Sequence, residues 1–331
     1  MAPDDSAVDR TADQQRRRER RRLPGHARTD RSEDRPTQSA RGRAEIPPTR
    51  VHESHYSNVS TRPPLEERFP APAVMGVINV TPDSFSDGGV YLNVEPAVTA
   101  AWGLFDAGAA LGDVGGESTR PGSRGVDADE ELRRVEPVLA DLQGAALSID
   151  TSKATVARRA LELGVEMVND VTALRGDPAL AGVVADAGCY VCLMHMLGEP
   201  RTMQVDPRYD DVVSDVKAFL EERLAFAVDA GVREEHVCLD PGIGFGKTVE
   251  HNLELLRRLD ELVAIGRPIL VGFSRKSTLG KLTGDPGART GSAAASVGAA
   301  VAAYERGATI LRAHDVREHV EALTVAAAVG R

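Results

Sequence analysis

The sequence predicts an α/β protein with the fold of a (β/α)8 TIM barrel, preceded by a disordered Arg-rich N-terminal extension. Three observations lead to this prediction: the length of 331 residues, eight short apolar segments after residue 70, and amphipathic segments between them. A barrel of this class takes about 250 residues, which matches the part of the chain that holds the eight segments. The low aromatic content of 4% also fits an α/β core better than an aromatic-rich all-β core.

The eight apolar segments have the pattern of parallel strands. They do not alternate between apolar and polar residues, which is typical of strands covered on both faces. The segments span residues 74–78, 111–114, 146–149, 166–168, 190–194, 237–239, 269–273 and 309–311. Helices are expected within the amphipathic segments 153–163, 212–230, 249–263 and 290–306. A doubly wound sheet is the alternative, but its Gly-rich turn should follow the first strand, where this chain has NVTPDSFSDGG.

Residues 1–70 differ in composition from the rest of the chain. They contain 15 Arg, no Lys and 12 acidic residues, a net charge of +3, whereas residues 71–331 carry a net charge of −13. A segment with so little apolar periodicity cannot offset its ordering entropy, so we expect residues 1–70 to be disordered and 71–331 to form the folded barrel domain. The block RRRERRR at 16–22 is interpreted as a solvated charge run; binding of nucleic acid by this arm is the less favoured alternative.

The remaining composition favours a cytoplasmic location. Three cysteines, Cys189, Cys192 and Cys238, are too few for a disulfide framework, which favours a reducing compartment. No apolar run reaches the roughly 20 residues that span a bilayer, so no membrane partner is expected. No apolar stretch follows the arginines, which argues against an export signal.

Polar groups follow every predicted strand. In a barrel the carboxyl ends of the strands converge on one rim, where active sites lie. Such a set of donors and acceptors predicts one ligand pocket. These residues are Asn79; Asp113, Glu117 and Arg120; Asp150; Asn169 and Asp170; His195; Asp240; Ser274 to Lys276; and Arg312 and His314.

One side of this rim is expected to bind an anion. Arg312 and His314 are two residues apart on a strand, so their side chains face the same way, and the pair suits a phosphate or diphosphate. Asn79 ends the adjoining first strand, where a neutral oxygen can join a Mg²⁺ ion that shares its ligands with water and substrate. The structural alternative is that Arg312 pairs with Asp315 or another acid.

The other side of the rim is expected to bind a planar heterocycle. Asp150, Asn169 and Asp240 end three strands and can accept hydrogen bonds from amino and ring N–H groups. Lys276 can stack over a ring or neutralise an anion. Asp150 also precedes a helix start, so helix capping is an equally good interpretation of that residue alone.

Two other motifs have a structural explanation that is simpler than a functional one. The loop DPGIGFGKT (240–248) resembles a phosphate loop, but Pro241 stands where that motif needs glycine. Cys189, Cys192 and His195 have metal-like spacing, but residues three apart on a strand point to opposite faces, so buried structural cysteines are expected. The loops 81–89 and 113–122 can exclude water from the rim.

Taken together, the motifs resemble those of bacterial dihydropteroate synthase, over about residues 74–326. The matching segments are MGVINVTPDSFSDGG (75–89), DVGGESTRPGS (113–123), SIDTSK (148–153), VND (168–170), DPGIGFGKT (240–248), VGFSRKS (271–277) and LRAHDV (311–316). The resemblance implies a transferase of folate biosynthesis that joins 6-hydroxymethyl-7,8-dihydropterin diphosphate to p-aminobenzoate and releases diphosphate and 7,8-dihydropteroate. It also implies a homodimer.

The resemblance further implies a role for each matching residue. The metal Mg²⁺ is assigned to Asn79. The pterin diphosphate is assigned to Thr119, Asp150, Asn169, Asp240, Lys276, Arg312 and His314, and the p-aminobenzoate pocket to Phe85, Pro121 and Ser277. The catalytic residues are Asp87, Lys276 and Arg120, with Asp87 supporting a pterin-stabilised cation after diphosphate departs.

Two rivals remain at this stage. A methyltetrahydrofolate-type methyltransferase shares the acids at the strand ends but lacks the TPDSF loop and the SRKS segment. A non-catalytic pterin-binding paralogue is the second rival. Loss of Asn79, Lys276, Arg312 or His314 would have indicated it, and all four are present.

Overall fold

Eight parallel strands form a single sheet in the computed structural model, in the order β6-β5-β4-β3-β2-β1-β8-β7. A bridge between Leu239 and Ile269 joins β6 to β7 and closes the barrel. The structure describes residues 62–81, 94–120, 122–123 and 125–330. The strands are β1 (Ala73–Asn79), β2 (Leu111–Gly115), β3 (Leu147–Asp150), β4 (Met167–Asp170), β5 (Tyr190–Met194), β6 (Val237–Asp240), β7 (Leu270–Val271) and β8 (Ile310–Ala313). The predicted barrel is confirmed.

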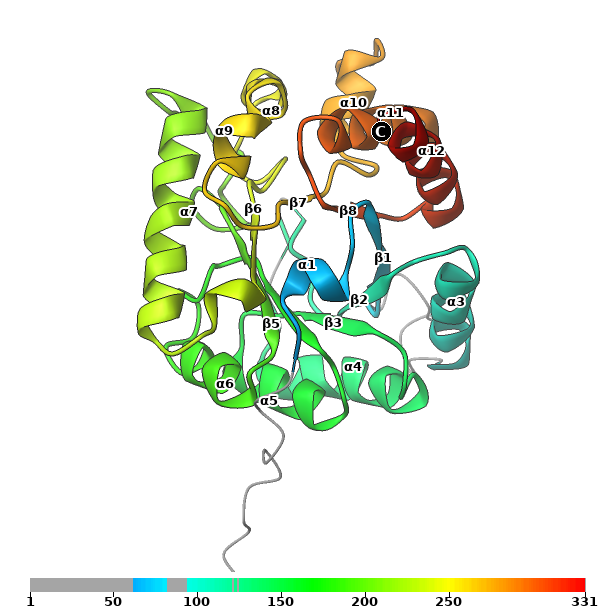
Figure 1. The fold of residues 1–331 in the computed structure, drawn as a ribbon, viewed down its shortest axis with the longest axis vertical. Helices are drawn as coiled ribbons and strands as arrows, with labels where there is room; N and C mark the ends of the chain where they lie inside the picture. The colour runs from blue at the N-terminus through cyan, green and yellow to red at the C-terminus, as the bar shows by residue number, and fades with distance from the viewer. Residues whose placement is uncertain (1–61, 82–93, 121, 124, 331) are drawn as a thin grey trace, which may run out of the picture. The chain divides into compact units, whose positions relative to one another are not determined.

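Helices surround the strands, as Figure 1 shows. Their bounds are α3 (Val94–Asp106), α4 (Ala128–Asp141), α5 (Ala154–Glu162), α6 (Leu180–Ala187), α7 (Val212–Asp229), α8 (Val249–Arg257), α9 (Leu259–Val263), α10 (Ser277–Leu282), α11 (Ala293–Tyr304) and α12 (Val316–Val329), with a 3-10 turn at Glu234–His236. Asp127, Asp211 and Ser292 begin α4, α7 and α11 as side-chain caps. None of the described helices is long and apolar enough to cross a membrane.

The predicted strands agree with the observed ones to within two residues at each end. The segment 269–273 forms only the two-residue strand β7, because the amide of Lys276 donates to the carbonyl of Phe273 at 3.0 Å and the chain turns there. The predicted helix over 249–263 is two helices, since α8 ends at Arg257 and α9 begins at Leu259.

Two apolar layers lie on opposite faces of the sheet. The inner layer fills the barrel, and the outer layer packs between the strands and the helices. Because side chains alternate along a strand, a residue two positions after an inner residue also points inward. Ile310 belongs to the inner layer, so Arg312 points into the barrel mouth, and Leu111 places Asp113 in the same way. The inner layer comprises Leu65, Phe69, Ala73, Met75, Leu111, Met167, Tyr190, Cys192, Cys238, Leu270 and Ile310.

A short N-terminal segment closes the opposite end of the barrel. Helix α1 (Leu65–Arg68) lies over this end in Figure 1, and Leu65 and Phe69 are 0% and 2% exposed. Arg68 forms a bidentate ion pair with Glu166, with both N–O distances at 2.8 Å. The hydroxyl of Tyr190 donates to the carbonyl of Pro63 at 2.9 Å.

The extension was predicted to run to residue 70, but residues 62–70 are an ordered part of the barrel. The segment RPPLEERFP contains only two large apolar residues, and their spacing of four covers a single helical turn, which is too short to establish a period in the sequence. The remaining part of the predicted disordered extension, 1–61, lies outside the described residues.

Truncating the N-terminal cover should destabilise the protein. Phe69→Ala removes a ring that is 2% exposed, and large-to-small changes of this kind cost about 3–5 kcal/mol. Urea unfolding followed by circular dichroism measures this loss. The control Glu67→Ala changes an exposed residue of the same helix and should fall within about 0.5 kcal/mol of wild type. Equal stability of the two variants would contradict the assignment of α1 to the core.

Candidate active site

The barrel mouth brings residues from four strands into one hydrogen-bonded cluster. Arg312 on β8 donates from Nε to Oδ2 of Asp113 on β2 at 2.7 Å and from Nη2 to Oδ2 of Asp150 on β3 at 3.2 Å. Asn169 on β4 donates from Nδ2 to the same Asp113 oxygen at 2.9 Å. Arg312, Asp150 and Asn169, which were predicted from separate motifs, are therefore connected, either by a direct hydrogen bond or through Asp113.

The sequence prediction noted Asp113 at a strand end but gave it no role. Its carboxylate is fully buried at the centre of the cluster. Its Oδ1 atom has no hydrogen-bond partner among the described residues, and neither does the hydroxyl of Ser148, its register partner on β3. The sequence does contain a signal for this position. Asp113 lies two residues after the inner residue Leu111 on the same strand, so its side chain also points into the barrel.

Burial shifts the pKa values of the acids in this cluster. Removal from water, together with the charge of Asp113, raises the pKa of Asp150 to about 8. Burial also raises the pKa of Asp240 to about 6, and the Oδ1 atom of Asp240 accepts a hydrogen bond from the amide of Gly242 at 2.7 Å. The charge of Arg312 opposes this rise in pKa at both Asp150 and Asp240.

Lys276 stands beside the acids, in the turn between β7 and α10. Its Nζ lies 4.0 Å from the centre of the Phe245 ring, which comes from the loop after β6. Burial and the charge of Arg312 lower the pKa of Lys276 to about 8, while Asp240 and Asp150 oppose this shift. Ser277, predicted for the p-aminobenzoate pocket, is the first residue of α10 and directly follows Lys276.

The predicted anion side carries His314, Arg120 and Asn79. His314 pairs with Ser274, whose Oγ lies 3.1 Å from its Nδ1, and burial and Arg312 lower the pKa of His314 to about 4. The charge of exposed Arg120 contributes to the lowered pKa of both His314 and Lys276, which places it near the same mouth. Asn79 ends β1, the strand that pairs with β8.

A small cavity of about 120 Å³ lies next to this cluster. Thr119 and Asp150 both line it, so the structure brings together one residue predicted for the diphosphate and one predicted for the pterin. Glu117 also lines it and pairs with Lys153, which in turn pairs with the fully buried Glu131 on α4. This ion-pair chain anchors the loop that carries Thr119 and Arg120.

The structure decides several alternatives left open by the sequence. Arg312 pairs with Asp113 and Asp150 and not with Asp315, which binds Arg275 at 2.6 Å. Asp150 does not cap α5; the carboxylate of Asp177 accepts from the amide of Ala154 at 2.9 Å instead. Cys189, Cys192 and Cys238 are buried and free, as predicted.

Three predicted site residues cannot be placed. Phe85, Asp87 and Pro121 lie outside the described residues. No group of three or more metal-ligating side chains occurs in the described part of the chain.

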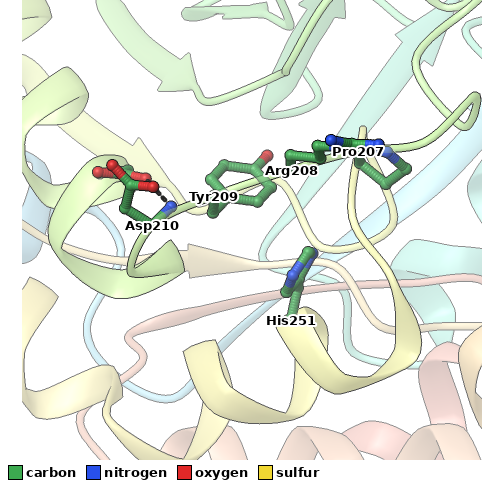
Figure 2. A pocket seen from close by; sticks show the side chains of 6 residues that line it. Pro207, Arg208, Tyr209, Asp210 and His251 are labelled. Carbon is green, nitrogen blue, oxygen red and sulfur yellow. Dashed lines mark hydrogen bonds between the residues drawn. The ribbon is translucent and has the colours of Figure 1, made fainter.

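A larger and more open hollow, of about 540 Å³, lies elsewhere on the surface (Figure 2). Tyr209 and His251 face each other across it, with ring centres 5.0 Å apart. No residue predicted for the site lines this hollow. Its charged residues are the exposed Asp210, Asp215 and Arg208. We assign the chemistry to the barrel mouth because the buried charges converge there. The hollow is lined by Pro207, Arg208, Tyr209, Asp210, Asp215 and His251.

Comparison with known proteins identifies the family of this chain. Residues 75–314 match the family described as "Pterin binding enzyme". Dihydropteroate synthase of Neisseria meningitidis serogroup C is 46% identical over 264 residues, covering 78% of this chain and 93% of that protein. The chain therefore belongs to the dihydropteroate synthases of this family, which are transferases of folate biosynthesis.

Solved structures lead to the same family. Dihydropteroate synthase of Xanthomonas albilineans with 4-aminobenzoic acid is 48% identical, with a TM-score of 0.72, and the match covers 79% of this chain and 94% of that one. The same enzyme in complex with 7,8-dihydropteroate is 45% identical, with a TM-score of 0.69, over 79% and 94% of the two chains.

Neutralising Asp113 should lower the pKa of Asp150. In Asp113→Asn the second-largest cause of the raised pKa is removed, so the carboxyl of Asp150 should titrate about one unit or more below its wild-type value near 8. Carbon-13 NMR titration of the aspartate carboxyls measures this change, with the signal assigned through Asp150→Asn. An unchanged pKa would show that the two carboxylates are not electrostatically coupled.

Proposed function

We propose that this chain condenses 6-hydroxymethyl-7,8-dihydropterin diphosphate with p-aminobenzoate at the barrel mouth. One observation carries the proposal: acids and an amide suited to a nitrogen-rich ring lie directly beside the Arg312 and His314 pair. The ligands named for the Xanthomonas structures, 4-aminobenzoic acid and 7,8-dihydropteroate, are a substrate and the product of this reaction.

The pterin ring is assigned to Asp150, Asn169 and Asp240, with Lys276 above it. The side chains of Asp150 and Asn169 are already tied to the Asp113 and Arg312 cluster, which holds them in place before the ligand arrives. Asp150 and Asp240 offer acceptor oxygens to the amino and ring N–H groups of the pterin.

The diphosphate is assigned to Arg312 and His314, with Thr119 and Arg120 from the loop after β2. Arg312 uses Nε and Nη2 on Asp113 and Asp150, which leaves Nη1 for a phosphate oxygen. As the C–O bond to the diphosphate breaks, the negative charge that develops on the leaving group is stabilised by the guanidinium groups of Arg312 and Arg120. The amine of p-aminobenzoate then forms the new C–N bond at the methylene carbon and gives up a proton.

The p-aminobenzoate pocket is assigned to Phe85, Pro121 and Ser277. In this proposal Asp87 supports the pterin-stabilised cation after diphosphate departs, because a carboxylate favours positive charge nearby. An arylamine is a weak nucleophile, so stabilising the leaving group and the cation contributes more than a strong base would.

Magnesium fits this site only together with the diphosphate. Asn79 supplies one neutral oxygen, and the described residues hold no carboxylate cluster that binds a cation alone. Arg312 and Arg120 disfavour a free cation at the mouth. When bound, Mg²⁺ would supply charge neutralisation to the diphosphate oxygens, with its remaining positions filled by substrate and water.

A homodimer and a cytoplasmic location complete the proposal. Val325 and Val329 on α12 are 64% and 81% exposed, which supports a protein contact on this face. The three cysteines are free and buried, which supports a reducing compartment.

Removing the Lys276 ammonium should impair the reaction without unfolding the protein. Purified Lys276→Ala, assayed with the pterin diphosphate, p-aminobenzoate and Mg²⁺ for released diphosphate and dihydropteroate, should lose about 100-fold or more in kcat/KM. Lys217→Ala, on the outer surface of α7, is the matched control and should keep wild-type kinetics. If Lys276→Ala turns over at the wild-type rate, the assignment of Lys276 to the site is wrong. If the wild-type protein forms no dihydropteroate in this assay, the proposed function is wrong.

Metal dependence should require the diphosphate. Calorimetric titration of Mg²⁺ into the protein alone should show no binding, because one neutral oxygen and nearby cations do not hold it. The same titration in the presence of diphosphate should show binding that is weakened in Asn79→Ala. Tight Mg²⁺ binding to the protein without diphosphate would contradict the proposed ligand set.

A further inference from the structure

Two motifs that the proposed function leaves unused meet in the structure. Lys247 belongs to the Gly-Lys-Thr sequence that resembles a phosphate loop, and His195, the last residue of the Cys189, Cys192 and His195 pattern, directly follows strand β5. Lys247 is 3% exposed and His195 is 5% exposed. The Nζ atom of Lys247 lies 2.8 Å from Nδ1 of His195 and donates to the carbonyl of Phe245 at 3.0 Å. Lys247 therefore points into the protein and not toward a phosphate.

Burial determines which group donates the hydrogen bond between Lys247 and His195. Removal from water and the charge of Lys247 lower the pKa of His195 to about 2, so the imidazole is neutral and its Nδ1 accepts the hydrogen bond. Burial also lowers the pKa of Lys247 to about 7, opposed by Asp240 and assisted by Lys276. The carbonyl oxygen of His195 lies 3.4 Å from the same Nζ atom, so three acceptors surround it, which matches the three N–H groups of an ammonium.

The pair joins two loops of the barrel mouth. We call residues 195–211 the β5 loop and residues 241–248 the β6 loop. Gly242 has a φ of 67°, and a Cβ there would lie 1.8 Å from the carbonyl oxygen of His195, so the backbones touch. The hydroxyl of Tyr209, which Figure 2 shows over His251, donates to the carbonyl of Gly246 at 2.8 Å.

The β6 loop in turn supports the predicted pterin site. It follows directly after Asp240, and it carries Phe245, whose ring lies under the ammonium of Lys276. A Cβ at Gly244 would lie 3.2 Å from Cδ of Lys276, so the loop backbone and the Lys276 stem are in close contact. A shift of the β6 loop would therefore move Lys276 and Phe245 together.

We propose that Lys247 and His195 are positioning residues. The buried hydrogen bond between them fastens the β6 loop to the β5 loop and holds Phe245 and Lys276 in the arrangement that binds the pterin ring. The inference rests on the proposed function for its kinetic consequence, whereas the fastening of the loops is a property of the protein alone.

Four variants test the pair. Lys247→Met removes the donor, His195→Leu removes the acceptor, and the double variant removes both. His195→Asn keeps an acceptor oxygen close to the position of Nδ1. A single change leaves a buried polar group unpaired and should lower Tm, whereas exchanging both partners for apolar groups is nearly neutral for stability. Lys217→Met, on the surface of α7, is the matched control.

The kinetic arm separates positioning from stability. Lys247→Met and the double variant should both raise KM for the pterin diphosphate about tenfold, with a smaller change in KM for p-aminobenzoate, although only the double variant regains its Tm. His195→Asn and Lys217→Met should remain close to wild type. If KM for the pterin diphosphate returns to normal wherever Tm returns, the pair is merely structural and the inference is wrong.

The second arm does not depend on activity. Hydrogen–deuterium exchange should be faster at amides 242–246 in Lys247→Met and in the double variant, but not in His195→Asn, with α12 unchanged in all of them. Unchanged exchange in this loop would overturn the inference even if the wild type is a fully active synthase. If the wild type is inactive but the loop loses protection as described, the proposed function fails and the fastening stands.

Discussion

The guanidinium of Arg312, held between the carboxylates of Asp113 and Asp150, is the interaction on which the rest of the site depends. Two acids so close together inside a barrel would repel each other, and one cation shared between them offsets that repulsion. The same cation contributes to the lowered pKa of Lys276 and His314. One buried charge thus influences both the side of the mouth assigned to the ring and the side assigned to the diphosphate.

The barrel makes this arrangement possible because it sorts side chains by alternation. Leu111 and Ile310, two residues before Asp113 and Arg312 on their strands, fill the interior, and the next inward positions reach the mouth. The apolar layer beneath excludes water from one side of the acids, which is the main cause of the raised pKa values of Asp150 and Asp240. The alternation of side chains along the strands therefore determines both the packing of the core and the pKa values at the site.

Much of this could be predicted from the sequence because the relevant signals are local. Eight apolar segments, and the polar residue that follows each, predict both the barrel and the set of groups at its mouth. The role of Asp113 was missed because a buried acid inside a strand resembles a turn residue when only strand ends are read. The cover formed by Leu65 and Phe69 was missed because its partners lie far along the chain, and the pairing of Lys247 with His195 was missed for the same reason. Contacts of that kind leave no periodic trace in a sequence.

The most direct measurement of the central claim is a crystal structure of this chain with 7,8-dihydropteroate. The account predicts the pterin ring at the barrel mouth, with hydrogen bonds to Asp150, Asn169 and Asp240 and with Lys276 over the ring, while Arg312 keeps its contact with Asp113. A pterin bound elsewhere, for example in the open hollow beside Tyr209 and His251, or a ligand at the mouth that touches none of these side chains, would contradict it.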